Sequence, residues 1–290
     1  MIVPILTGAT CSGKTALALE LAERFDAEIV GADSRQIYRG MPVGTAAPTA
    51  AERARVPHHL VDFLDPHERY SAARFVADAT AALAGVRARG KRALVVGGTG
   101  FYIRALTGDV ALSNAFDPAL RERLAREAWL HPPDVLHAWL RTRDAARAAA
   151  LAPGDGYRIV RALEIALAPP RENVPFPRAT GFTFRKIVLD VPDGELEARI
   201  ARRVDAMLAG GLLEEAERIG SGAVAADAVG YPQALAYLAG RSTATELRAA
   251  LVRATRRYAK RQRTWFRSEP GVTWADPAGA LRHACAVLEA

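Results

Sequence analysis

The sequence has little cysteine and no long apolar run. Only two of its 290 residues are cysteine, Cys11 and Cys285, and they form no plausible structural pair. Unpaired thiols are typical of a reducing cytoplasm, which is where we expect the protein. No stretch combines a basic flank with an apolar run of bilayer length, so we expect neither a signal peptide nor a membrane span.

The histidines and the net charge limit the kinds of metal site and binding partner that the sequence allows. Of the six histidines, His58 and His59 are adjacent rather than at ligand spacing and the others are scattered, which argues against a transition-metal site. Half of the residues are apolar, enough for one large core or two smaller ones. The net charge of +7 favours a polyanionic partner, unless the basic residues are spread out and serve only solubility.

A phosphate-loop motif, G-x-x-x-x-G-K-[ST], lies near the N-terminus between an apolar run and a helical pattern. Glycines let backbone N–H groups turn toward an oxyanion, the helix start adds partial positive charge, and the lysine adds a full one. The loop comprises Gly8, Ala9, Thr10, Cys11, Ser12, Gly13, Lys14 and Thr15. We expect Cys11 to contribute its backbone only and the Thr15 hydroxyl to suit Mg²⁺. Kinases, ATPases and transferases that release pyrophosphate all need such a loop, so the motif leaves the polyphosphate open.

The order of apolar runs predicts an α/β fold, a P-loop NTPase-like parallel sheet flanked by helices, with a smaller all-helical insertion domain. Strands are expected at 2–6, 28–32, 60–63, 92–96 and 184–191. Helices are expected at 14–25, 72–89, 193–209, 211–219, 231–239, 243–267 and 277–289. The catalytic core would comprise 1–112 and 185–290. The insertion, 113–184, would hold helices over 117–167 and a proline-rich loop at 168–184.

Polar side chains follow two of the predicted strands. Asp33 comes after the second strand, at the sheet edge that faces the phosphate loop, so it either meets the reacting group, caps the next segment or holds Mg²⁺ through water. Gln36 follows, and an amide can pair with adenine at two points. Thr99 follows another strand within a glycine turn, where it either donates to phosphate or only caps the next helix.

A stretch near the C-terminus carries charge of one sign. Eight Lys or Arg and no acid occur between Arg248 and Arg267. On a helix, six of them share about a third of the circumference: Arg253, Arg256, Arg257, Lys260, Arg263 and Arg267. We refer to these six as the basic stripe. Leu251, Thr255, Tyr258, Gln262 and Trp265 line the opposite face, which would pack. Solvated faces usually mix signs, so the stripe favours nucleic-acid phosphate. Arg199 and Arg203, four residues apart on a helix, share a face and could reach the crevice.

Taken together, these segments resemble bacterial tRNA dimethylallyltransferases over nearly the whole chain. The matching stretches are GATCSGKT at 8–15, ADSRQIYRGMPVGTA at 32–46, PHHLVD at 57–62, YSAARF at 70–75, GGTGFY at 97–102, RIVRALE at 158–164, VGY at 229–231 and TRRYAKRQRTWFR at 255–267. The first is shared with many enzymes. The pair D-S-x-Q-I-Y-x-G-M and T-R-x-x-A-K-R-Q-x-T-W is highly specific.

The resemblance implies transfer of a dimethylallyl group from dimethylallyl diphosphate to N6 of the adenosine immediately 3′ of the anticodon, with Mg²⁺ and release of diphosphate. By the same resemblance, Asp33 is the general base, Thr99 and Arg203 contact the diphosphate and the reacting groups, and Lys14 with Thr15 cradles the leaving group. The segments implied to touch the tRNA anticodon stem-loop contain Asp33, Ser34, Arg35, Gln36, Thr99, Arg121, Tyr157, Arg158, Arg161, Gly230 and Tyr231. The basic stripe adds Arg256, Arg257, Lys260 and Arg263.

Some positions depart from the family pattern. Ala9 and Cys11 replace the usual Pro and Ala at positions where the backbone binds, so we expect little effect; Gly156 and Pro232 also differ, in segments implied to contact tRNA. A P-loop kinase, an isopentenyltransferase acting on free adenylate and a non-catalytic RNA-binding protein are the alternatives. We expect a monomer.

Overall fold

The computed structural model describes residues 1–110, 112, 117–168 and 179–290. The chain divides into two compact units: Met1–Val110 with Pro177–Ala290, and Ala111–Phe176. The predicted proline-rich loop falls in part on 169–178, which lies outside the described residues. Residues 179–182, which the sequence assigned to the insertion, join the first unit: the Met1 amino group donates to the Gly181 carbonyl at 3.2 Å, and Arg87 lies over the Phe182 ring.

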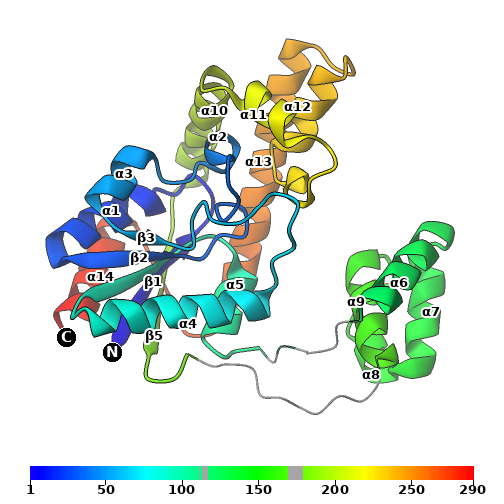
Figure 1. Cartoon of the computed structure of the whole chain (residues 1–290), viewed down its shortest axis with the longest axis horizontal. Helices are drawn as coiled ribbons and strands as arrows, with labels where there is room; N and C mark the ends of the chain where they lie inside the picture. Colours follow the sequence, from blue (N-terminus) through cyan, green and yellow to red (C-terminus); the bar gives the residue numbers. More distant parts are fainter. Residues whose placement is uncertain (111, 113–116, 169–178) are drawn as a thin grey trace. The chain divides into compact units, whose positions relative to one another are not determined.

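The first unit is built on a six-stranded, wholly parallel sheet (Figure 1), with strand order β3-β2-β4-β1-β5-β6. The strands are β1 (Ile2–Gly8), β2 (Ala27–Gly31), β3 (His58–His59), β4 (Arg92–Val96), β5 (Thr183–Leu189) and β6 (Val272–Ala275). The central strands are almost continuously apolar and buried, as a parallel sheet covered on both faces requires. The predicted α/β fold is confirmed.

Two edge strands differ from the prediction. The strand expected at 60–63 lies at His58–His59, because Leu60 and Asp62 adopt left-handed backbone angles, φ 59° and 56°, that end the extended conformation. Val61 and Leu64 are still buried, so their apolar character reflects loop packing. The strand Val272–Ala275 was not predicted; its four residues give too short an alternation to stand out.

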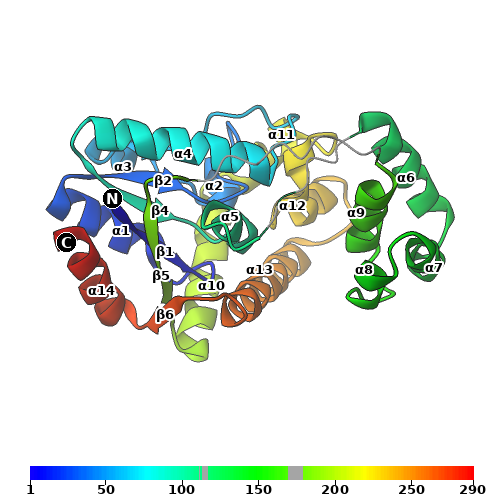
Figure 2. The ribbon, with the colours of Figure 1, turned by 90° about the horizontal axis from the view of Figure 1, so that it is seen from below.

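Helices cover both faces of the sheet (Figure 2). On one face lie α1 (Lys14–Phe25) and α14 (Pro277–Glu289), whose small and apolar side chains share a buried cluster with the strands. On the other lie α4 (Ala72–Ala88), α5 (Gly100–Leu106) and part of α13 (Ala244–Arg267). Thr243 and Glu246 form a capping box at the start of α13, which gives this long helix a defined first turn.

A second buried cluster unites helices with the segment that follows β2. It contains residues of α10 (Asp193–Ala209), α11 (Leu212–Ile219), the 3-10 turn η1 (Val224–Asp227) and α12 (Tyr231–Leu238), together with the first half of α13. The short helices α2 (Pro42–Thr45) and α3 (Ala50–Arg55) were not predicted. This cluster anchors the first part of α13, and the basic stripe lies on the part of the helix that follows.

The second unit is helical, as Figure 1 shows: α6 (Pro118–Leu130), α7 (Pro133–Arg143), α8 (Ala145–Ala149) and α9 (Gly156–Leu167). Leu124, Leu136, Leu140, Ile159 and Leu163 form its buried core. Asp117 and Asp155 cap α6 and α9 through their carboxylates. Within the described residues, no helix of either unit is long and apolar enough to cross a membrane.

Candidate active site

The phosphate loop connects β1 to α1 in a conformation that only certain residues tolerate. Gly8, Cys11 and Gly13 have φ values of 138°, 64° and 98°. A Cβ at Gly8 would lie 2.8 Å from the Leu189 carbonyl oxygen, so the close approach of β5 requires glycine there. The loop therefore forms an anion cradle at the carboxyl end of the central strand.

Lys14 lies within this cradle. Its Nζ donates to the carbonyl oxygens of Gly8 at 3.0 Å and Ala9 at 2.7 Å, which uses two of its three hydrogens. Burial lowers the pKa of Lys14 to about 8; the carboxylate of Asp33 opposes this shift, and the guanidinium of Arg203 adds to it. Lys14, Asp33 and Arg203 thus interact electrostatically in one site.

Both arginines of α10 reach backbone carbonyl groups of the loops that follow the strands. Arg199 donates to the Ser12 carbonyl at 3.0 Å and the Cys11 carbonyl at 3.4 Å, and Glu195 holds it at 2.6 Å. Arg203 donates to the Thr45 carbonyl at 3.3 Å, and its buried Nε has no hydrogen-bond partner in the described part of the chain. The buried Nε–H of Arg203 is therefore a donor that can be offered to an anion, because a buried N–H is costly to leave unpaired.

Asp33 follows β2, and its carboxylate has the expected capping role. Its Oδ1 accepts from the backbone N–H of Arg35 at 2.9 Å and of Gln36 at 3.4 Å, so it does cap the next turn. Its Oδ2 has no hydrogen-bond partner among residues 1–110, 117–168 and 179–290. Burial, and then the negative charge of Asp33, raise the pKa of Tyr258 on α13. One carboxylate oxygen is therefore fixed by backbone N–H groups, and the other has no hydrogen-bond partner in the described part of the chain.

Thr99 lies at the N-cap position of α5, but its hydroxyl makes no capping hydrogen bond. Instead, Oγ1 accepts from the Ser34 N–H at 2.9 Å and donates to the Ser34 Oγ at 3.3 Å. The capping alternative for this side chain is therefore wrong. Thr99 joins the turn after β4 to the turn after β2, which places the Asp33 segment beside the glycine turn.

Arg35 and Gln36 are already engaged within the protein. Both amide hydrogens of Gln36 go to backbone carbonyls, Thr45 at 3.2 Å and Ala46 at 3.0 Å. This arrangement does not permit two-point pairing with adenine, which needs one amide hydrogen free, so that interpretation is wrong. Arg35 forms a two-point ion pair with Asp227, with N–O distances of 2.7 and 3.1 Å.

Tyr231, included among the tRNA contacts, is fully buried and so offers no surface to RNA. Its hydroxyl donates to Oε1 of Glu215 at 2.7 Å. Buried Glu215 also accepts from the N–H groups of Val43 at 2.9 Å and Gly44 at 2.7 Å, at the start of α2. Tyr231 therefore stabilises α2. The carbonyl groups at the end of α2 accept hydrogen bonds from Gln36 and Arg203. Gly230 is buried as well, with φ 111°, and its N–H donates to the Gln233 side chain.

Removal of the Tyr231 hydroxyl tests this structural role. Tyr231→Phe lowers the free energy of unfolding by about 1–3 kcal/mol, because the buried Glu215 loses a donor, and leaves the tRNA affinity of the folded protein unchanged. Urea denaturation measures the loss, with Tyr237→Phe on the same helix as control. Unaltered stability with weakened tRNA binding would instead place Tyr231 at the RNA surface.

Acidic side chains in and just before α10 form ion pairs with two residues of the basic stripe. Arg256 pairs with Glu197 at 3.4 Å, and Arg263 pairs with Asp190 at 3.3 Å and with Asp193. Arg253, Arg257, Lys260 and Arg267 are exposed and have no acidic partner within the described residues. Four of the six side chains of the basic stripe are therefore both exposed and without an acidic partner in the described part of the chain.

The remaining predicted tRNA contacts lie in the second unit. Arg121 forms a two-point ion pair with Glu164 at 2.7 and 3.0 Å, and Arg161 pairs with the same carboxylate. Arg158 is exposed and lies 3.5 Å from Asp155, and Tyr157 is 85% exposed. Tyr157 and Arg158 thus present accessible surface in this unit.

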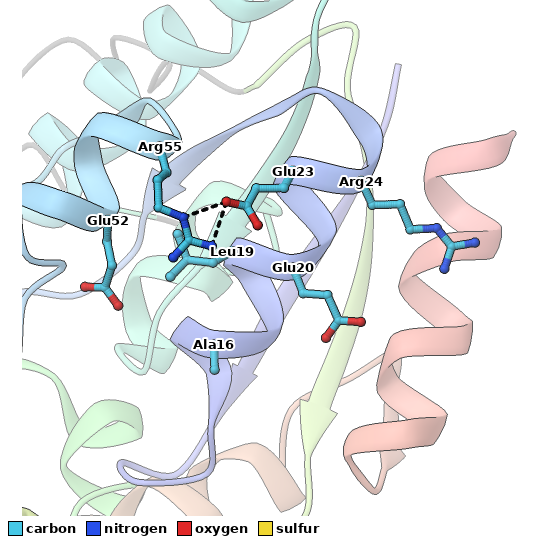
Figure 3. A pocket seen from close by; sticks show the side chains of 7 residues that line it. All are labelled: Ala16, Leu19, Glu20, Glu23, Arg24, Glu52 and Arg55. Atoms are coloured by element: carbon cyan, nitrogen blue, oxygen red, sulfur yellow. Dashed lines mark hydrogen bonds and ion pairs between the residues drawn. The ribbon is translucent and has the colours of Figure 1, made fainter.

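The hollow drawn in Figure 3 lies away from the phosphate loop, between α1 and α3. Charged side chains of both signs line it, and Arg55 pairs with Glu23 across it at 2.7 Å. The charges of Arg55 and Glu23 neutralise each other, so this hollow is a less suitable anion site than the phosphate loop.

Gln262, predicted only to lie on the packing face of α13, is a buried residue that contacts both the phosphate loop and the glycine turn. The feature of the sequence that could have revealed this role is a polar amide on the packing face of α13, because a buried amide needs hydrogen-bond partners.

These features define a class: a P-loop α/β protein in which an anion cradle and a carboxylate share one crevice at the carboxyl ends of parallel strands. A family model described as IPP transferase matches residues 36–269, and one described as isopentenyl transferase matches residues 1–59. The chain belongs to the IPP transferase family.

Named relatives and solved structures agree with this family. A tRNA dimethylallyltransferase from Anaeromyxobacter dehalogenans (strain 2CP-C) is 46% identical, with 96% of this chain and 95% of that protein covered. The crystal structure of the tRNA isopentenylpyrophosphate transferase from Bacillus halodurans has a TM-score of 0.71 at 35% identity, with 99% and 96% covered. A eukaryotic dimethylallyltransferase acting on tRNA has a TM-score of 0.78 at 26% identity, with 95% of this chain and 74% of that one covered.

Proposed function

We propose that this protein transfers the dimethylallyl group of dimethylallyl diphosphate to N6 of the adenosine immediately 3′ of the anticodon in tRNA, with release of diphosphate. The observation that carries the proposal is a chain of hydrogen bonds that joins the phosphate loop, through Gln262, to the glycine turn, and that turn, through Thr99, to Ser34 beside Asp33. The names of the relatives support tRNA as the acceptor over a free adenylate, and prenyl transfer over phosphoryl transfer.

Prenyl transfer to an adenine amine needs both a carboxylate and cationic groups. The exocyclic amine of adenine is a poor nucleophile, so a carboxylate must accept its proton as the N–C bond forms. We assign this role to Asp33, whose Oδ2 is unpartnered while Oδ1 is fixed by backbone N–H groups. The C–O bond to diphosphate breaks in the same process, and the growing charge is met by Lys14, Arg203 and the loop N–H groups.

Hard oxygen donors near the loop fit Mg²⁺, which usually binds through one or two protein ligands, substrate phosphate and water. The Thr15 hydroxyl is partly exposed and has no hydrogen-bond partner in the described part of the chain, so it would hold the ion, with Asp33 acting through water. When bound, Mg²⁺ would neutralise charge on the diphosphate. Among the described residues, no group of three or more His, Cys, Asp or Glu forms a metal site, which suits an ion held mainly by substrate.

For RNA contact we propose the exposed part of the basic stripe, together with Tyr157 and Arg158 of the second unit and Ser34 beside Thr99. Arg35, Arg121 and Arg161 would contribute through segments that their ion pairs hold in place. We further propose that the protein acts as a monomer in the cytoplasm.

Transfer of label tests the function. The protein is incubated with labelled dimethylallyl diphosphate and Mg²⁺ plus either tRNA or AMP, and nucleosides are then analysed. We expect label on N6 of adenosine in tRNA and none on AMP. Label on AMP would indicate the free-adenylate enzyme, phosphate transfer from ATP a kinase, and tRNA binding without transfer a non-catalytic protein.

The salt dependence of tRNA binding tests the RNA surface. Arg257→Ala with Lys260→Ala reduces the slope of log affinity against log salt by about 1.5, because each phosphate contact contributes about 0.7–0.9. Arg24→Ala with Arg282→Ala removes the same charge from α1 and α14, on the other face of the sheet, and leaves the slope unchanged. Equal slopes for wild type and the α13 variant would show that these residues do not meet phosphate.

A further inference from the structure

Gln262 forms a bridge between two loops of the crevice. It lies on α13, and its side chain is 6% exposed. Its Oε1 accepts from the Thr10 N–H at 2.8 Å, and its Nε2 donates to the Gly98 carbonyl oxygen at 2.9 Å. The amide thus uses both of its ends on backbone groups more than 160 residues away in the chain.

The two loops belong to neighbouring strands. Thr10 follows β1 and Gly98 follows β4, and these strands pair in parallel up to Leu6 and Val96. Beyond that pair, the strands are joined by the Gly97 N–H to Leu6 carbonyl bond at 3.2 Å and the Thr7 hydroxyl to Gly97 carbonyl bond at 2.8 Å. Beyond the last of these contacts, the side chain of Gln262 joins the segment after β1 to the segment after β4.

The glycine turn is shaped to receive this helix. A Cβ at Gly98 would lie 2.3 Å from Nε2 of Gln262, and one at Gly100 would lie 2.2 Å from the Trp265 ring. Neither distance is tolerated, so α13 packs directly on the backbone of the turn. Thr99 lies between these two glycines and is joined to Ser34 beside Asp33.

We propose that Gln262 is a positioning residue for prenyl transfer: it fixes the phosphate loop against the turn that carries Thr99. It thereby sets the spacing between the diphosphate and the Asp33 segment. It also commits the Thr10 N–H, so that the diphosphate is met by the other loop amides. This inference rests on the proposed function, because the spacing matters only if both groups act on one pair of substrates.

Gln262→Met tests the inference, since it keeps length and burial but removes both hydrogen bonds. We expect kcat for transfer to tRNA to fall about 10- to 100-fold, because misplacement of about 1 Å can cost that much. Pyrophosphate affinity, measured by calorimetry, should fall severalfold while tRNA affinity does not change. Thr273→Ala, at an exposed position of β6, serves as control.

A second variant keeps the test decisive if Gln262→Met does not fold. Gln262→Glu retains the acceptor for Thr10 but donates to Gly98 only when protonated, so its activity relative to wild type should rise as pH falls. Wild-type kcat and pyrophosphate affinity in either folded variant, or a pH-independent activity ratio for Gln262→Glu, would overturn the proposal. Absence of transfer by wild type would refute the proposed function instead, whereas the pyrophosphate measurement would still report on the loop.

Discussion

Asp33→Asn lowers kcat for transfer to tRNA by about 10²- to 10⁴-fold, the range that general base catalysis supplies. The substitution is chosen to separate the two functions of this side chain. Asparagine retains an oxygen that can accept from the N–H of Arg35, as Oδ1 does at 2.9 Å, so the turn after β2 is preserved. It removes the proton acceptor, because an amide does not take up a proton near neutral pH.

Steady-state kinetics with tRNA, together with tRNA binding in the absence of dimethylallyl diphosphate, measure this effect. We expect unchanged tRNA affinity. Asp33→Ala, which also removes the cap, should lose the same activity and some stability in addition. Turnover by Asp33→Asn at the wild-type rate would remove Asp33 from the mechanism.

Lys14→Met reduces kcat/KM for dimethylallyl diphosphate by about 10²- to 10³-fold, as expected when a charge aimed at a developing oxyanion is lost. Methionine fills most of the same volume, so the loop backbone should persist. Arg24→Met, at an exposed position of α1, is the control. A change confined to KM, with wild-type kcat at saturation, would show that Lys14 binds the diphosphate equally before and during departure.

The pH profile gives an independent readout of the same lysine. Because burial lowers the pKa of Lys14 to about 8, the side chain is charged below that pH and neutral above it. For the free enzyme, kcat/KM for dimethylallyl diphosphate should therefore decline as the pH rises through about 8. The decline should be absent from the residual activity of Lys14→Met. Persistence of the same decline in that variant would assign it to another group.

Local patterns were sufficient for four of the six strands and for the phosphate loop. Apolar runs of strand length located β1, β2, β4 and β5, and the spacing of Gly8, Gly13 and Lys14 located the loop and the start of α1. The strand expected at 60–63 failed because the backbone at Leu60 is left-handed, which apolar character does not reveal. Periodicity reports burial more directly than it reports backbone angle.

Partners distant in the chain could not be predicted in the same way. The ion pairs of Arg256 and Arg263 depend on acids in and just before α10 that helical periodicity within α13 does not reveal. Tyr231 lies in a segment implied to contact tRNA, yet its own side chain points into the core toward Glu215. A motif identifies a segment that matters, whereas the role of each side chain depends on which groups the fold brings to it.

The decisive experiment is label transfer to two tRNA transcripts that differ only in the residue immediately 3′ of the anticodon. We expect the wild-type protein to label the transcript with adenosine at this position and not the one with guanosine, although both transcripts bind. Equal labelling of the two transcripts, or no labelling of either, would contradict this expectation.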